Sequence, residues 1–117
     1  MAYMLLIQEP VGQRQTRTEA EGHAAYASML KFADELKSRG ILRGVESLAS
    51  QDKAARVTVR DGRPQIFDGP FAEAKEMVGG FFLIDCATQA EAVGIAAQCP
   101  AAAWCTVEVR SLGPCYT

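Results

Sequence analysis

The sequence is poor in several features that would directly indicate a class of function. Its 117 residues include a single histidine and 4 cysteines, none of them spaced as Cys-x-x-Cys. This spacing gives little support to a zinc site, and we expect no metal, with reduced and mostly buried thiols. Lysine and arginine number 12 against 14 acidic residues, for a net charge of −2. The basic residues are scattered along the chain, which argues against a nucleic-acid-binding surface.

Long hydrophobic runs are also absent. The apolar run from Tyr3 to Ile7 is far shorter than the ~20 residues that a membrane-spanning helix needs, and no other run is longer. The opening MAYMLLIQEP lacks a basic start and a small-residue cleavage site, so we expect no signal peptide and a cytoplasmic protein. Hydrophobic residues at 49% and charged residues at 22% are typical of a globular chain. The length predicts a single domain covering residues 1–117.

Apolar runs and alternating patterns predict most of the strands. We expect strands at Tyr3 to Ile7, Ile41 to Leu48, Ala55 to Arg60, Gln65 to Phe67, Phe81 to Ile84 and Cys105 to Arg110. Asp61-Gly62 is a two-residue hairpin turn, so the third and fourth of these strands should pair antiparallel.

Two capping-box patterns predict the helices. Thr18-Glu19-Ala20-Glu21 opens a helix that should end before Gly40, and Thr88-Gln89-Ala90-Glu91 opens one that should end before Pro100. In the first helix, apolar residues at helical spacing predict one buried stripe; they are Tyr26, Met29, Leu30, Ala33 and Leu36.

The order of these elements predicts an α+β fold, a ferredoxin-like sandwich with both helices on one face of the sheet. The runs Tyr3 to Ile7 and Phe81 to Ile84 are apolar on both faces, so the second face also needs a cover. A homodimer that packs sheet against sheet would provide one. The alternative is that the extra apolar residues belong to edge strands and have no partner.

One segment carries a family resemblance. The string DGPFAEAKEMVGGFFLIDC from Asp68 to Cys86, with the opening YMLLI and the closing VEVR, resembles the DGPF-domain branch of the YCII-related family. The resemblance covers nearly the whole chain and implies a dimeric α-β barrel in a small bacterial protein of mostly unassigned activity. It also implies relatives that include muconolactone-isomerase-like and dechlorinating enzymes. Some members of the family sit beside extracytoplasmic-function sigma factors. The histidine that the founding branch pairs with an aspartate falls here at about Met29, so His23 does not restore that pair.

Asp68 is the first candidate for catalysis. It ends a strand, and the rigid Gly69-Pro70 that follows holds it between two phenylalanines, Phe67 and Phe71. Partial removal from water would make its carboxylate a better general acid or base. Alternatively, Asp68 only caps the turn by accepting hydrogen bonds from backbone N–H groups.

His23 is the second catalytic candidate because histidine exchanges protons near neutral pH, although it also suits a plain surface position in a fraying first turn.

Candidates for ligand binding are Lys75, Glu73, Glu76, Arg43 and Phe71. Lys75 or Arg43 would hold an anion, and the glutamates would share proton transfer with Asp68. The alternatives are a solvated turn for Glu73, Lys75 and Glu76 and a cross-strand ion pair for Arg43. Gly79-Gly80 indicates a bulge or a tight strand entry, not a phosphate cradle.

These residues support two hypotheses of different kinds. The first is a small-molecule enzyme or ligand-binding protein with its pocket between sheet and helices. Cofactor-free carboxylate chemistry would suit an isomerase or lyase acting on a small carboxylated substrate. The second is a non-catalytic accessory or regulatory protein in a sigma-factor pathway.

Overall fold

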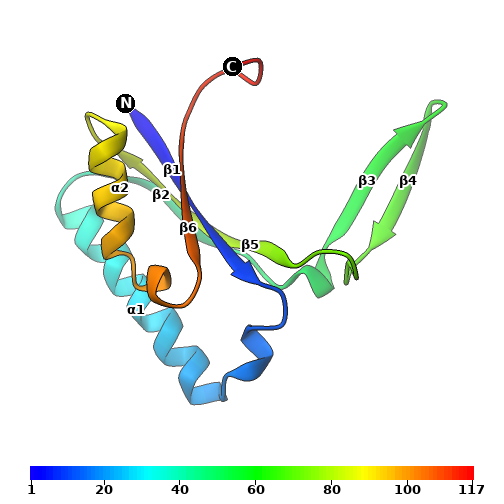
Figure 1. The fold of residues 1–117 in the computed structure, drawn as a ribbon, viewed down its shortest axis with the longest axis horizontal. Coiled ribbons are helices and arrows are strands. Elements are labelled where there is room, and N and C mark those ends of the chain that lie inside the picture. Colours follow the sequence, from blue (N-terminus) through cyan, green and yellow to red (C-terminus); the bar gives the residue numbers. More distant parts are fainter.

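Strand β1 (Ala2–Pro10) lies at the centre of the computed structural model, which describes all 117 residues (Figure 1). It pairs antiparallel with β5 (Glu76–Asp85) on one side and β6 (Thr106–Ser111) on the other, and β2 (Leu42–Ser47) pairs with β5. The resulting main sheet has the order β2-β5-β1-β6. Two helices, α1 (Glu19–Ser38) and α2 (Gln89–Gln98), follow β1 and β5 in the chain. This mixed α+β arrangement fits the ferredoxin-like sandwich that the sequence predicts.

Both helices pack on one face of the main sheet. Leu5 of β1 and Ile84 of β5 point to that face and are fully buried, together with Leu36 of α1. Along β1, burial alternates from residue to residue, because every second side chain points into this core. No helix of the chain combines the length and the apolar composition that crossing a membrane requires.

Strands β1 and β5 extend beyond the predicted apolar runs because their ladder continues past an irregularity. Ile7 pairs with Gly80, whereas the next residue, Gln8, pairs with Val78. Gly79 is therefore the extra residue of a β-bulge, as the Gly79-Gly80 pair predicts. The ladder then continues to Pro10 and Glu76, which brings Glu9 into the sheet.

Helix α1 begins and ends where its caps predict. Thr18 and Glu21 form a complete capping box, and Gly40 follows the last turn with a φ of +74°. In the second box Thr88 accepts from the Glu91 N–H, but the Glu91 carboxylate accepts from the Ala87 N–H.

The predicted buried stripe of α1 is wrong at its N-terminal half. Ala33 and Leu36 are buried, but Tyr26 is 54% exposed and Leu30 is 49% exposed. The physical reason is a cavity between this half of the helix and the sheet, so these side chains form a wall and do not fill a core.

Strands β3 (Ala55–Arg60) and β4 (Arg63–Asp68) form a separate two-stranded hairpin, called the arm below. The Asp61-Gly62 turn predicted between them is present, with positive φ at both residues as a type I′ turn requires. The arm projects away from the helices and the main sheet (Figure 1). Its projection explains a radius of gyration of 16.1 Å, where a compact chain of this length would have about 13 Å.

Candidate functional site

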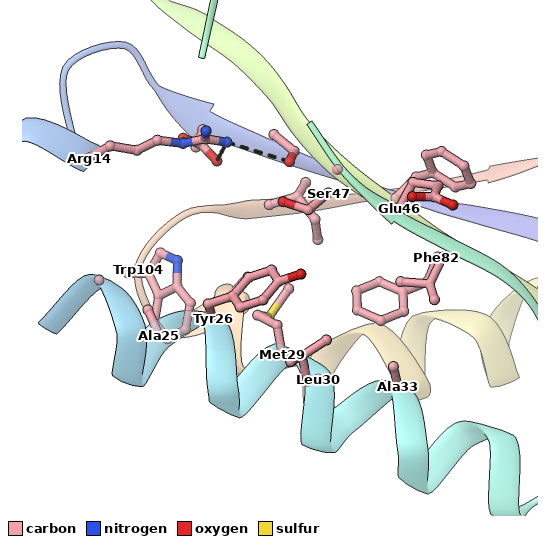
Figure 2. Close-up of a pocket in the computed structure, with 18 of the residues that line it drawn as sticks. Arg14, Ala25, Tyr26, Met29, Leu30, Ala33, Glu46, Ser47, Phe82 and Trp104 are labelled. Carbon is pink, nitrogen blue, oxygen red and sulfur yellow. Dashed lines mark hydrogen bonds and ion pairs between the residues drawn. The ribbon is translucent and has the colours of Figure 1, made fainter. Parts of the chain in front are cut away.

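A pocket of about 370 Å³ lies between the N-terminal half of α1 and the main sheet (Figure 2). Small residues of α1 leave this space open; they are Gly22, Ala25 and Ala33, and Gly79 and Gly80 of β5 belong to the sheet side of the lining. Larger apolar side chains complete the walls; they are Ile7, Tyr26, Met29, Leu30, Val45, Phe82 and Trp104. We call this cavity the α1 pocket.

A partly buried ion pair forms one side of the α1 pocket. Glu9 points to the helix-facing side of β1 and is only 9% exposed. Arg14, from the short 3₁₀ turn Arg14–Thr16, donates Nε to Glu9 Oε1 at 2.6 Å and Nη2 to Oε2 at 3.2 Å. This two-point contact neutralises the carboxylate and fixes its orientation.

Gly79 makes room for that pair. A Cβ atom at Gly79 would overlap the Glu9 carboxylate, and Arg14 also reaches the Gly79 carbonyl oxygen at 3.5 Å. Gly80 has a different neighbour, since a Cβ there would press on the Glu46 carbonyl oxygen of β2. The paired glycines therefore serve two close approaches, one to a side chain and one to a backbone.

Arg17 and Trp104 form the end of the pocket. The Arg17 guanidinium carbon lies 5.5 Å from the centroid of the Trp104 ring, which is a cation–π distance. Arg17 is half-buried and takes no part in the ion pairs of the chain. Gln13 donates its side-chain N–H to the Trp104 carbonyl oxygen at 2.7 Å and holds this loop in place. Tyr26 projects from α1 into the space between helix and sheet (Figure 2).

The thiols near the pocket are not activated as nucleophiles. Burial, with a smaller contribution from the Glu9 carboxylate, raises the pKa of Cys105 to about 11. Burial also raises the pKa of Cys99. Both thiols are therefore protonated near neutral pH. Cys115 is exposed, which departs from the mostly buried set we expected.

Asp68, the first catalytic candidate, lies outside the α1 pocket. It is the exposed last residue of β4 and pairs with Ala55 across the arm. The turn after it is held by the backbone, because the Gly69 N–H donates to the Ala54 carbonyl oxygen at 2.8 Å. Gly69 also approaches the Gln51 carbonyl oxygen so closely that no side chain fits there.

Phe71 and Glu73 of the same segment are organised by one arginine. The Arg56 guanidinium carbon lies 3.8 Å from the centroid of the buried Phe71 ring, and Arg56 pairs with Glu73 at 3.2 Å. Phe71 and Glu76 also line a second, more open hollow where the arm leaves the main sheet. Lys75 is exposed, and its carbonyl oxygen accepts from the Val11 N–H at 2.9 Å.

The remaining two candidates are surface residues. His23 is exposed on α1 beside Gly22, and Gly22 itself lines the pocket. Arg43 pairs with Asp85 on the neighbouring strand at 3.5 Å, which is a cross-strand ion pair. None of the seven predicted site residues lines the α1 pocket, and their roles stay predictions.

Sequence reasoning did not select Glu9, Arg14, Arg17 or Trp104. A signal existed for Glu9, since it continues the alternation Tyr3, Leu5, Ile7 on the inward face of β1. The other three lie in loops and a 3₁₀ turn, where no periodicity indicates a direction.

Comparison with known proteins gives a family but no activity. A family model described as the YCII-related domain matches residues 1–114. An uncharacterised protein of Rhizobium meliloti (strain 1021) is 44% identical over 57 residues. That match covers 49% of this chain and 46% of the relative, so the chain spans about half the length of the curated relative it matches.

Proposed function

We propose that this protein, which belongs to the YCII-related family, binds a small molecule in the α1 pocket. The observation that carries the proposal is the position of Tyr26 and Leu30. They continue the apolar stripe of α1 yet are about half exposed, facing a cavity and not a core. Apolar walls with few polar groups are typical of ligand sites, and 370 Å³ is near the small end of their size range.

The cost of the empty space supports the same proposal. Protein interiors are close-packed, and an unfilled apolar cavity destabilises the fold. The small residues of α1 around the pocket, Gly22, Ala25 and Ala33, would fill it if they carried larger side chains. A bound ligand would instead contact the exposed faces of Tyr26 and Leu30 and stabilise the folded chain.

Binding is better supported than catalysis. The carboxylate inside the pocket belongs to Glu9, and Arg14 already occupies both of its oxygens. A cofactor-free isomerase or lyase with Asp68 or His23 as acid or base stays a secondary proposal, because both lie outside the pocket. A DGPF-branch assignment and an accessory role in a sigma-factor pathway rest on the family resemblance alone.

Two helix glycines provide a matched test. Gly22 lines the pocket and Gly94 lies on the exposed side of α2, and a Cβ atom at either would meet nothing within 4 Å. Gly22→Leu should therefore extend into the pocket mouth from a Cβ atom that has open space around it, whereas Gly94→Leu adds the same side chain elsewhere.

The measurement uses Trp104, the only tryptophan of the chain and part of the pocket wall. Single-ring fragments (phenol, benzyl alcohol, benzamide and benzoate) are titrated while its fluorescence is followed. We expect at least one fragment to bind, with affinity reduced about tenfold or more in Gly22→Leu and unchanged in Gly94→Leu. Equal binding by the two variants, or no response to any fragment, would contradict the proposal.

We also propose that the chain forms a homodimer through the outer face of the main sheet, in the manner of a dimeric α-β barrel. On this face Met4 pairs with Leu83 and Leu6 pairs with Phe81. None of these four side chains belongs to the core under the helices. An uncovered apolar centre of this kind favours a second copy as its cover.

A further inference from the structure

We propose that the α1 pocket selects an aromatic monocarboxylate, with the carboxylate bound by Arg17 and the ring held between Trp104 and the apolar wall of α1. This inference rests on the proposed binding function and names the ligand class for that site. It depends on which charges of the pocket are already paired.

Arg17 is the unpaired charge at the Trp104 end. Glu9 and Arg14 neutralise each other through two hydrogen bonds. The neighbouring Glu21 carboxylate is engaged in the capping box, where it accepts from the Thr18 N–H at 2.8 Å, and the Arg17 charge is the weakest of the causes that lower the Glu21 pKa. Arg17 makes no ion pair and is half-buried, so its guanidinium offers free donors to a ligand.

The charged side chains of the lining give the pocket a direction. Glu46 also belongs to the lining, but it pairs with Phe81, whose side chain points to the outer face of the main sheet, so its carboxylate does not face the ligand space. Arg17 at the Trp104 end therefore remains to attract a ligand anion. The carboxylate should lie at Arg17, with the apolar part of the ligand pointing inward.

The chemistry of this end favours a carboxylate over a dianion such as phosphate. One free guanidinium matches one negative charge, and its planar fork suits the two oxygens of a carboxylate. The cation–π contact at 5.5 Å places the Arg17 guanidinium before a ligand arrives, which lowers the ordering cost of binding.

An aromatic ring matches the walls beyond Arg17. The indole of Trp104 and the ring of Tyr26 lie next to each other on the α1 side of the cavity, with Met29 beside Tyr26 and Phe82 farther from Trp104 (Figure 2). Flat aromatic faces and a thioether pack well against a ring. An aliphatic acid of the same charge would leave part of these faces uncovered.

The test compares benzoate with benzamide, which has nearly the same shape and no charge, in Trp104 fluorescence titrations of the full chain at pH 7. We expect benzoate to bind at least about tenfold more tightly than benzamide, and acetate not to bind in the same range. Arg17→Gln should remove the preference for benzoate and leave benzamide binding unchanged. Arg63→Gln, an exposed arginine of the arm, is the matched control and should keep the preference.

The outcomes separate this inference from the proposed function. Equal affinities for benzoate and benzamide in the wild type, with both lost in Gly22→Leu, overturn the carboxylate requirement and leave the pocket function standing. A benzoate preference that survives in Arg17→Gln overturns the role of Arg17. If neither compound binds but phenol or benzyl alcohol does, the carboxylate requirement fails and the pocket function stands; if none of the four fragments binds, both proposals fail. Preserved thermal unfolding of Arg17→Gln shows that a lost preference is a binding effect.

Discussion

At the scale of single residues, Gly79 lies so close to the Glu9 carboxylate that a Cβ atom there would overlap it. The bulge places Gly79 directly beneath the Glu9 carboxylate, so the ion pair with Arg14 requires a residue without a side chain at this position. The same argument does not extend to Gly80, whose close neighbour is the backbone of β2. The two glycines can therefore be told apart by experiment.

We predict that Gly79→Ala lowers the free energy of unfolding by about 2 kcal/mol, because the new methyl group displaces a mostly buried carboxylate from its arginine. In a Glu9→Ala background the same change should cost less than about 0.5 kcal/mol, since the Glu9 atoms are gone and only the flexible end of Arg14, 3.1 Å from the new Cβ atom, has to shift. Urea unfolding of the four chains measures this coupling.

Gly80→Ala is the matched control for that cycle. Its Cβ atom would lie 2.7 Å from the Glu46 carbonyl oxygen, a contact that Glu9→Ala does not relieve. Its cost should therefore be the same in both backgrounds. A Gly79→Ala cost that is also unchanged by Glu9→Ala would show that the two residues do not compete for space.

At the scale of single residues, sequence patterns did not identify the residues of the pocket. Asp68 stood out because a turn with an acid and a proline interrupts an apolar run, and such turns are local features. The position of Glu9 in the pocket depends on the bulge at Gly79 and on Arg14, which lies in a 3₁₀ turn. Neither the bulge nor the direction of the Arg14 side chain is visible as a pattern in the neighbouring sequence, so no sequence rule selects the pair.

At the scale of elements, the local rules worked well for helix ends and tight turns. The capping box at Thr18 and the Asp61-Gly62 turn are found where their short motifs indicate. Both depend on contacts within a few residues. Whether the arm would join the main sheet depended on distant contacts, and the sequence left that undetermined. The stripe on α1 failed for the same reason, because the cavity beside Tyr26 is not encoded in the helix itself.

We predict that Thr18→Ala lowers the free energy of unfolding by about 1 kcal/mol, because the Glu21 N–H loses its acceptor at the start of α1. Thr18→Ser keeps that acceptor and should retain most of the stability. Thermal unfolding of the three chains measures the difference. Equal stability of Thr18→Ala and wild type would mean that the cap contributes nothing.

The Glu21 side of the box adds a pH dependence to the same comparison. Hydrogen bonds from the Thr18 backbone, and then from its side chain, lower the pKa of Glu21 below 4.5. A lowered pKa stabilises the fold above the ordinary carboxyl range, and this contribution is lost as the pH falls through the folded-state value. The stability difference between wild type and Glu21→Gln should therefore shrink on acidification from neutral pH.

At the scale of the whole molecule, two apolar surfaces are without a partner. On the outer face of the main sheet, the apolar centre formed by Met4, Leu6, Phe81 and Leu83 is flanked by charged residues on both edge strands; they are Glu46 on β2 and Glu108 and Arg110 on β6. An apolar centre with a polar rim is the usual anatomy of a protein interface.

The arm carries the second surface. On one side of the hairpin Val57 pairs with Ile66, and Val59 pairs with Pro64. The exposed fractions are 62% for Val57, 65% for Ile66 and 58% for Val59. An isolated two-stranded hairpin is only marginally stable in water. Packing of this side on a second copy would stabilise the arm and add area to the sheet interface, which needs about 800 Å² per partner.

We predict that the wild-type chain sediments as a dimer at micromolar concentration. Leu6→Glu should shift it to monomer by placing a charge in the apolar centre, with the dissociation constant raised about a hundredfold or more. Thr106→Glu is the control, because Thr106 lies on the same face at the exposed end of the edge strand β6.

The arm is tested separately, with paired substitutions on its two sides. Val57→Ser with Ile66→Ser removes apolar surface from the exposed side, whereas Thr58→Ser with Gln65→Ser changes the cross-strand pair on the opposite side. If the arm packs on a second copy, the first pair should weaken dimerisation about tenfold or more, since burying each aliphatic side chain contributes about 1.5–3 kcal/mol, and the second pair should have little effect. A dimer that responds to Leu6→Glu but to neither arm pair would confine the interface to the sheet. A wild-type monomer at micromolar concentration would contradict both interfaces. It would show that the outer face of the main sheet and the exposed side of the arm both stay in contact with water.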